Sequence, residues 1–407
     1  MVCRQLEGLA GAVSRIAPSR PAFVCVVLFA LSLFASGGSG DGVRYLVGAH
    51  YYVWYPNNFA QGYLRGVLRP AQTPALGEYD SRRASIAEQH IALAVSHGID
   101  FFTLDWWPNR PAQNAAIESG FLRAKNIGAI RFCIFYESTD LGDPARGNGI
   151  VFDAATKDRF VSDLMTIARR YFGHPSYLRI DGRPALVLYV TREMRGFFPQ
   201  AMREMRRAMA AEGYDPFVIG DEIFWAVVES TEDPGAAPRV TGEPQLSRIR
   251  LFDALTAYNL YMEGRERHRG YGSASDFVPD SAKLYRRYRD VARIPIIPGM
   301  IPGFNDRAVR PRPDHFVIPR RWTAGAPEAS FFAEAIERIG KPLADPKLHA
   351  VLITSWNEWS EDTAIEPLSP SPPTADDVSG RQLFTQGYAY QGFGSAYLDV
   401  VRDHLRH

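Results

Sequence analysis

The sequence predicts an α/β fold, a single (β/α)₈ TIM barrel with long loops at its C-terminal rim. Three observations predict it. Eight short apolar or β-branched runs occur between residues 45 and 355 of the 407-residue chain, segments of helical length separate most of them, and polar side chains follow the ends of the runs. Strands that alternate with helices form a parallel sheet, and eight of them are enough to close a barrel.

The predicted strands are nearly continuous apolar runs, as expected for strands buried on both faces of a sheet. In chain order they are Tyr45–Tyr52, Phe101–Asp105, Ile130–Tyr136, Ala185–Tyr189, Phe217–Gly220, Ala254–Tyr258, Pro295–Met300 and Ala350–Ser355. The predicted helices are Ile86–His97, Ala115–Ala124, Lys157–Tyr171, Gln200–Glu212, Asp280–Val291, Ser330–Ile339 and Ser395–His404. Two stretches rich in Pro, Gly and Arg, Thr231–Glu243 and Asn305–Thr323, fit long loops over the barrel mouth.

The first 40 residues have the pattern of a signal peptide. Arginines within the first 20 residues precede the uncharged apolar run Pro21–Ala35, and the small residues Ser36–Gly40 follow it. We therefore expect residues 1–40 to be a leader, residues 41–407 to be the catalytic domain, and the protein to be secreted or periplasmic. The apolar run is shorter than the roughly 20 residues of a membrane span. A membrane partner is expected only if the leader stays uncleaved and anchors the chain outside the cytoplasm.

The composition argues for an uncharged partner. Lys and Arg total 46, Asp and Glu total 45, and the two signs are mixed along the chain, so no basic stripe predicts nucleic-acid binding. Aromatic residues reach 12% of the chain, which suits stacking on sugar rings, although large barrel cores also use aromatics. Cys133 is the one cysteine beyond the predicted leader, so we expect no disulfide framework. We expect a monomer.

The motifs of several other chemistries are absent from the sequence. There is no phosphate-cradling Gly-rich loop, no His-Glu-x-x-His pair and no Gly-x-Ser-x-Gly nucleophile turn. We therefore expect neither a metal nor an organic cofactor.

The segment Val351–Pro367, VLITSWNEWSEDTAIEP, predicts the chemistry most directly. An apolar strand ends in carboxylates set among tryptophans. Glycoside hydrolysis needs one carboxyl group to protonate the leaving oxygen and a second to act as base or nucleophile, while aromatic faces hold the sugar. Glu358 and Glu361 are the candidate catalytic pair, with Trp356 and Trp359 as candidate sugar platforms. The alternative is that these acidic residues only cap the next helix.

Polar and aromatic side chains also follow the other predicted strands, and in a barrel these positions share one rim. Taken singly, each is more simply a solvated loop charge or a helix cap, but their joint placement favours a substrate cleft. The residues expected to contact substrate are Tyr52, Trp54, Glu78, Trp106, Trp107, Glu137, Asp221, Tyr258, Arg307, Asn357 and Trp359.

Six segments in order along the chain resemble glycoside hydrolase family 99 and its wider group of family 99-like proteins, which includes polysaccharide-locus proteins. The most specific is Asn357–Pro367, which is similar to the active-site signature of that family. The others are Tyr51–Tyr55, Leu76–Ser81, Gly98–Trp107, His174–Pro184 and Pro298–Arg307.

The resemblance implies a (β/α)₈ barrel and a retaining, endo-acting hydrolase of α-mannosidic linkages. By position, it implies that Glu358 is the base for the 2-hydroxyl of the sugar, giving a 1,2-anhydro sugar, and that Glu361 is the acid and then the base. A general acid at neutral pH needs a raised pKa. We expect Glu358, Asp362 and the tryptophans to raise the pKa of Glu361.

Three positions depart from the family pattern. Ser360 and Asp362 stand where the family usually has His and Gly, and Asp105 stands where Ser is expected. The sugar is therefore left open. The alternatives are an α-glucanase and a non-catalytic protein of polysaccharide binding, biosynthesis or export on the same barrel.

Overall fold

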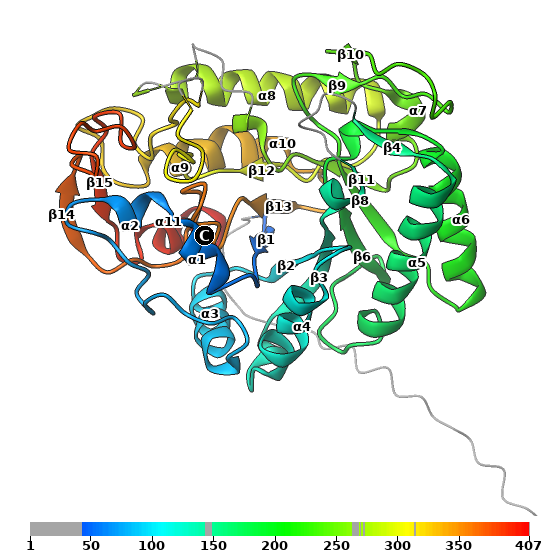
Figure 1. Cartoon of the computed structure of the whole chain (residues 1–407), viewed down its shortest axis with the longest axis horizontal. Coiled ribbons are helices and arrows are strands. Elements are labelled where there is room, and N and C mark those ends of the chain that lie inside the picture. The colour runs from blue at the N-terminus through cyan, green and yellow to red at the C-terminus, as the bar shows by residue number, and fades with distance from the viewer. Residues whose placement is uncertain are drawn as a thin grey trace, which may run out of the picture. The chain divides into compact units, whose positions relative to one another are not determined.

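The computed structural model describes residues 43–142, 149–262, 268, 270–271, 273–312 and 315–406. Eight parallel strands form a nearly closed barrel with helices outside it, so the predicted (β/α)₈ fold is confirmed (Figure 1). The barrel strands are β1 (Leu46–Tyr51), β2 (Phe101–Trp106), β3 (Arg131–Tyr136), β6 (Arg183–Leu188), β8 (Phe217–Asp221), β11 (Ala254–Thr256), β12 (Gly299–Met300) and β13 (Ala350–Ile353).

The barrel closes weakly at one seam. Paired strands run in the order β11, β8, β6, β3, β2, β1, β13, β12. Between β11 and the seventh strand the closure is an isolated bridge of Leu255 to Ile296, with hydrogen bonds of 2.9 Å from Leu255 N to Pro295 O and 2.8 Å from Ile297 N to Leu255 O. The seventh predicted strand, Pro295–Met300, is therefore regular only at its end.

Close packing inside the barrel explains one glycine. Gly48 in β1 pairs with Phe101 in β2, and a Cβ at Gly48 would lie 2.2 Å from the Phe101 ring.

The centre of the barrel also holds a buried His50, whose Nδ1 lies 2.6 Å from the Thr103 hydroxyl. Burial lowers the pKa of His50 to about 3, so the imidazole is neutral at physiological pH.

The helices follow the predicted order with shifted ends. The described α-helices are α1 (Asn57–Gln61), α2 (Leu64–Val67), α3 (Ala84–Ser96), α4 (Pro111–Ser119), α5 (Ala154–Tyr171), α6 (Phe198–Ala211), α7 (Leu246–Ile249), α8 (Ser273–Ala292), α9 (Ser330–Ala335), α10 (Lys341–Leu343) and α11 (Ala396–Leu405). The largest correction to a helix end is at α8, predicted at Asp280–Val291, which begins at Ser273. Both ends also differ at α4, predicted at Ala115–Ala124. It begins at Pro111, whose fixed φ suits a first helical position.

Short strands that the sequence did not predict shape the loops. They are β4 (Ile150–Phe152) with β7 (Met194–Gly196), β5 (Arg179–Ile180) beside β6, β9 (Val227–Val228) with β10 (Val240–Thr241), and β14 (Ser371–Thr374) with β15 (Tyr390–Gly392). The predicted leader, residues 1–40, lies outside the described residues. Among the helices that are described, none is both long and apolar enough to cross a bilayer.

Candidate active site

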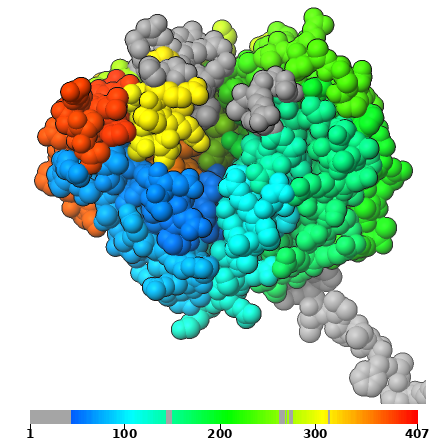
Figure 2. Space-filling view, in the orientation of Figure 1, coloured from blue at the N-terminus to red at the C-terminus, as the bar shows by residue number. Residues whose placement is uncertain are grey.

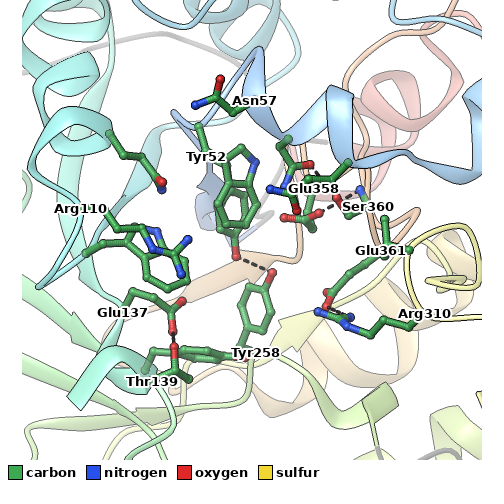
Figure 3. A pocket seen from close by; sticks show the side chains of 17 residues that line it. Tyr52, Asn57, Arg110, Glu137, Thr139, Tyr258, Arg310, Glu358, Ser360 and Glu361 are labelled. Atoms are coloured by element: carbon green, nitrogen blue, oxygen red, sulfur yellow. Dashed lines mark hydrogen bonds and ion pairs between the residues drawn. The ribbon is translucent and has the colours of Figure 1, made fainter. Parts of the chain in front are cut away.

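A cavity of about 610 Å³ lies at the C-terminal ends of the barrel strands. On the face shown in Figure 2, blue, cyan and yellow segments surround a hollow, and Figure 3 shows the lining side chains from close by. The lining residues are Tyr52, Trp54, Asn57, Asn58, Gln61, Trp107, Arg110, Gln113, Glu137, Thr139, Tyr189, Tyr258, Val309, Arg310, Glu358, Ser360 and Glu361.

Glu358 is held on the wall that follows β13. Its side chain is 3% exposed, and its Oε1 accepts a hydrogen bond of 2.9 Å from the Ser360 backbone N–H. Its own N–H donates to the Ser355 hydroxyl over 2.7 Å. Ser360 in turn donates its hydroxyl to Asn58 over 2.5 Å, which ties this wall to α1.

Glu361 reaches the same cavity and contacts two donors. Its Oε2 accepts a hydrogen bond of 2.7 Å from the Tyr261 hydroxyl, and its Oε1 lies 3.2 Å from Arg310 Nη1. The same Arg310 nitrogen lies 3.1 Å from the buried Asp306 carboxylate (the Glu361 contact is drawn in Figure 3). Asp306 also contacts the His315 ring at 2.9 Å. Arg310 is thus held between two carboxylates.

The two glutamates share one electrostatic environment. Burial raises the pKa of Glu358, and the charge of Glu361 raises it further. Burial also raises the pKa of Glu361, but Arg310 and the Tyr261 hydroxyl oppose that effect. Neighbouring buried carboxylates do not readily ionise together. The charge on Glu361 therefore opposes ionisation of Glu358, while Arg310 and the Tyr261 hydroxyl favour the charged form of Glu361.

The expectation for Asp362 is wrong. Its carboxylate turns away from the cavity and accepts hydrogen bonds from Arg65 at 2.7 Å and from Arg320 at 3.1 Å, all three side chains being at most 3% exposed. Asp306, and not Asp362, is the neighbouring anion that raises the pKa of Glu361. The backbone of Asp362 is left-handed, with φ of 50°. Glycine adopts this conformation without strain, which fits the glycine that family 99 usually has at this position.

Two other residues of the signature lie behind the cavity wall. Asn357 is fully buried, accepts from the Tyr52 N–H at 2.8 Å and donates to the Tyr52 carbonyl at 2.9 Å. Trp359 is fully buried and donates its Nε1–H to Glu366 over 3.1 Å. Neither lines the cavity. Asn357 holds the signature loop to the residue that follows β1, and Trp359 holds the loop to Glu366 near its own end.

Tyr52, Trp54 and Tyr258 form an aromatic surface beside the glutamates. The rings of Tyr52 and Trp54 stack at 4.2 Å, and the Tyr52 hydroxyl lies 2.5 Å from that of Tyr258. The Tyr258 N–H donates to Asp221 over 2.8 Å. Asp221 is fully buried and also pairs with Arg192 at 2.8 Å, so it positions Tyr258 from outside the cavity.

Three more residues expected to touch substrate lie outside the cavity lining. Trp106 is buried and stacks on Tyr136 at 5.8 Å. Arg307 donates to the carbonyls of Leu383, Arg312 and His315, and so holds loops together. Glu78 is exposed and accepts a hydrogen bond from Tyr63.

The wall after β2 and β3 carries Trp107 and Glu137. Trp107 donates its Nε1–H to Asp105 over 2.7 Å, and Gln113 donates to the same oxygen over 2.9 Å. The unusual Asp105 therefore orients Trp107. Burial raises the pKa of Glu137 to about 8, although the Thr139 hydroxyl, 2.6 Å away, opposes that effect.

Sequence reasoning did not single out most of the polar lining. Asn57, Asn58 and Gln61 come from α1, a short helix without a clear apolar period. Arg310 comes from a loop with several arginines, and the sequence does not distinguish the one that reaches the cavity. Within the described ranges, no group of three or more His, Cys, Asp or Glu side chains is arranged to hold a metal ion.

A family model described as "Glycosyltransferase WbsX" matches residues 48–371. The chain belongs to this family. Two curated relatives, one from each of two strains of Xanthomonas campestris pv. campestris, are both named "Uncharacterized protein WxcX". Each is 26% identical over an alignment of 320 residues that covers 74% of this chain. The chain spans only 42% of the length of these relatives.

Solved structures share the fold over nearly the whole chain. The GH99 endo-α-mannosidase of Bacteroides thetaiotaomicron is 18% identical with a TM-score of 0.56, and the match covers 89% of this chain and 96% of that one. A "Glycoside hydrolase-like protein" is 17% identical with a TM-score of 0.63 over 90% of this chain and 95% of that one. The resemblance to the family 99-like group is thereby confirmed, and the barrel is that of these glycoside hydrolases.

Proposed function

We propose that this WbsX-family chain is a retaining, endo-acting glycoside hydrolase of an α-linked polysaccharide, with α-mannan-like polymers as the first candidates. The observation that carries the proposal is that Glu358 and Glu361 line one cavity at the rim of a glycosidase-type barrel, next to the stacked rings of Tyr52 and Trp54. Paired carboxyl groups and aromatic faces are what glycoside cleavage requires.

In the proposed mechanism the sugar takes part through its own 2-hydroxyl. Glu358 removes the proton of that hydroxyl, O2 attacks C1, and the bond from C1 to the leaving oxygen breaks while Glu361 protonates that oxygen. A 1,2-anhydro sugar results. Glu361 then deprotonates water, which attacks C1, the C1–O2 bond opens, and O2 recovers its proton from Glu358. The two inversions at C1 give net retention.

Proton placement gives Arg310 a role in this scheme. In the free cavity Arg310 and Tyr261 stabilise the ionised form of Glu361, whereas the acid step needs the protonated form. The side chain of Arg310 is 46% exposed, so it has room to move. We propose that substrate loosens the Arg310 contact, which raises the pKa of Glu361 and favours the protonated form that the acid step needs.

The test is to incubate the purified protein with α-mannans, α-glucans and bacterial capsular polysaccharides and to measure new reducing ends. We expect release from at least one α-linked polymer, with oligosaccharides as early products, as an endo-acting enzyme gives. Linkage analysis of the products separates a mannanase from an α-glucanase. Glycan binding by calorimetry without release from any polymer would contradict the proposed hydrolysis and favour a binding or export role.

A second candidate is sugar transfer, which the description of the matched family favours. The same anhydro intermediate would be opened by a hydroxyl of an acceptor glycan instead of water, with Glu361 removing the acceptor proton. Mass spectrometry of reactions with added acceptor oligosaccharides distinguishes the two. Products longer than the acceptor indicate transfer, and fragments alone indicate hydrolysis.

We also propose that the predicted leader, residues 1–40, directs the chain out of the cytoplasm. N-terminal sequencing of protein recovered from an expressing cell tests this directly. A first residue near Gly40 supports cleavage and release, and an intact N-terminus in the membrane fraction supports anchoring.

A further inference from the structure

Arg110 is a cation of the cavity that the proposed chemistry leaves unused. Two arginines line the cavity, and Arg310 is occupied by Glu361 and Asp306. Arg110 lies across the cavity from Glu358 and Glu361 (Figure 3). Its ion pair with Asp140 is long, at 3.5 Å, and its side chain is 46% exposed.

The guanidinium of Arg110 is held in place from below. Its Cζ lies 3.5 Å from the centre of the Trp107 ring, a cation–π contact. Trp107 is fixed by its Nε1–H bond to Asp105 and by two hydrogen bonds between its backbone and the Asn114 side chain, at 2.8 and 2.7 Å. Stacking uses the flat face of a guanidinium and leaves its in-plane N–H donors for another partner.

Two carboxylates outside the cavity lining act on Arg110: Asp140 lies 3.5 Å away, and Asp105 is bound by Trp107 and Gln113. Gln113, Asn57, Asn58 and Gln61 line the cavity without adding charge. Because burial raises the pKa of Glu137 to about 8, this carboxyl is mostly neutral at pH 7 and neither repels an anion nor neutralises Arg110. The guanidinium contacts Asp140 through Nη2 at 3.5 Å, and its other donors match a carboxylate, which a guanidinium binds through two parallel hydrogen bonds.

We propose that Arg110 and Trp107 form a subsite for a carboxylate-bearing sugar, so that the polysaccharide recognised by this cavity contains a uronic acid or another acidic residue. The inference deepens the proposed function and rests on the cavity being the glycan site. Because Arg110 lies across from the two glutamates, the acidic sugar is a neighbour of the cleaved residue rather than the cleaved residue itself.

The test measures binding, so that it does not depend on turnover. Calorimetry with the Glu358→Gln protein compares α-linked oligogalacturonides and uronate-containing capsular fragments with the same oligosaccharides after carboxyl reduction. A charge-assisted bidentate contact predicts that the acidic form binds about ten- to a hundredfold more tightly. Raising the salt concentration should narrow this advantage, since screening weakens an exposed ion pair.

Variants of Arg110 decide whether this residue is responsible. In the Glu358→Gln background, Arg110→Gln should abolish the preference for the acidic form, whereas Arg110→Lys, which keeps the charge without the fork of donors, should retain part of it. Arg131→Gln is the matched control, because Arg131 is exposed at the start of β3, the opposite end of that strand from the cavity. Equal binding of acidic and reduced forms, no binding of any acidic form, or a preference that survives Arg110→Gln would overturn the proposal. If the parent protein binds acidic sugars in this way but releases no reducing ends, the carboxylate subsite is supported and the proposed hydrolysis is contradicted.

Discussion

The two sides of the cavity are built differently. On the β13 side, Glu358 is 3% exposed, and its neighbours Asn357, Trp359 and Asp362 are fixed from behind by buried hydrogen bonds and ion pairs. On the β2 side, Arg110 is 46% exposed on its side chain and rests on an aromatic ring. Reacting groups need exact placement and a dry setting, which a buried network provides. A group that captures a polymer from solvent needs open donors. Under the proposed function, the buried β13 side carries the chemistry and the more open β2 side carries recognition of the polymer.

The largest expected effect is the loss of a catalytic carboxyl on the β13 side. Glu358→Gln keeps the shape of the side chain and removes its capacity as a base, so kcat should fall by about 10²- to 10⁴-fold, with a much smaller change in KM. Glu232→Gln is the control, since Glu232 is exposed and does not line the cavity. Parent-like kcat in Glu358→Gln on every accepted glycan would show that the β13 side does not carry the reaction.

The next effect concerns the support behind that side. Asp362→Asn would leave Arg65 and Arg320 buried without their shared counterion, and breaking a buried pair in this way costs about 3–5 kcal/mol of the free energy of unfolding. Urea denaturation measures the loss. Asp181→Asn is a matched control, because Asp181 has the same left-handed φ of 50° but is exposed. If the two variants had equal free energies of unfolding, the ion pairs of Asp362 would contribute no measurable stability, and the expected loss would be contradicted.

A smaller effect tests how Arg310 tunes the pair. Arg310 opposes the rise in the pKa of Glu361, so Arg310→Gln should raise that pKa. If Glu361 is the acid, activity requires its protonated form, and the alkaline limb of the kcat/KM profile should move to higher pH in the variant. Movement of the acidic limb instead would assign the base role to Glu361. An unchanged profile would mean that Arg310 does not act on either group.

The last effect comes from Glu137, near the β2 side. Its pKa of about 8 in the folded chain exceeds the usual value of 4.5, so folding favours the protonated form. The stability it adds is complete below about pH 4.5 and is lost as the pH rises through 8. Glu137→Gln cannot ionise, and its unfolding free energy should therefore fall less between pH 5 and pH 9 than that of the parent. Parallel pH curves for the two proteins would contradict the raised pKa.

Most of the barrel could be predicted because its strands carry an unambiguous apolar pattern. Predicted Ile130–Tyr136 and observed β3 differ by one residue. The error at α4 has a tertiary cause. The helix ends at Ser119, and at the following residue, Gly120, a Cβ would lie 1.9 Å from the Ser81 carbonyl oxygen, a contact that no local pattern reveals. The short regular part of the seventh strand, β12, has a tertiary cause as well, because the neighbouring strand β11 pairs with this segment only through the isolated bridge of Leu255 to Ile296.

The site was harder to predict than the fold, because a loop has no periodicity that assigns its residues to one face. Glu358 and Ser360 line the cavity, while Asn357 and Trp359, one position away, are buried behind it. Placing them correctly requires the path of the backbone through Asp362, which is left-handed. Arg110 was missed for a related reason. Its importance lies in the ring beneath it and in the length of its ion pair, neither of which the sequence specifies.

In the proposed function, the two glutamates cleave an α-linked glycan with the help of its own 2-hydroxyl. The most direct measurement is proton NMR of the first products released from the polymer that the protein cleaves best. We expect the new reducing ends to appear first as the α anomer and only later to reach the equilibrium mixture of anomers. Reducing ends that appear first as the β anomer would contradict this expectation.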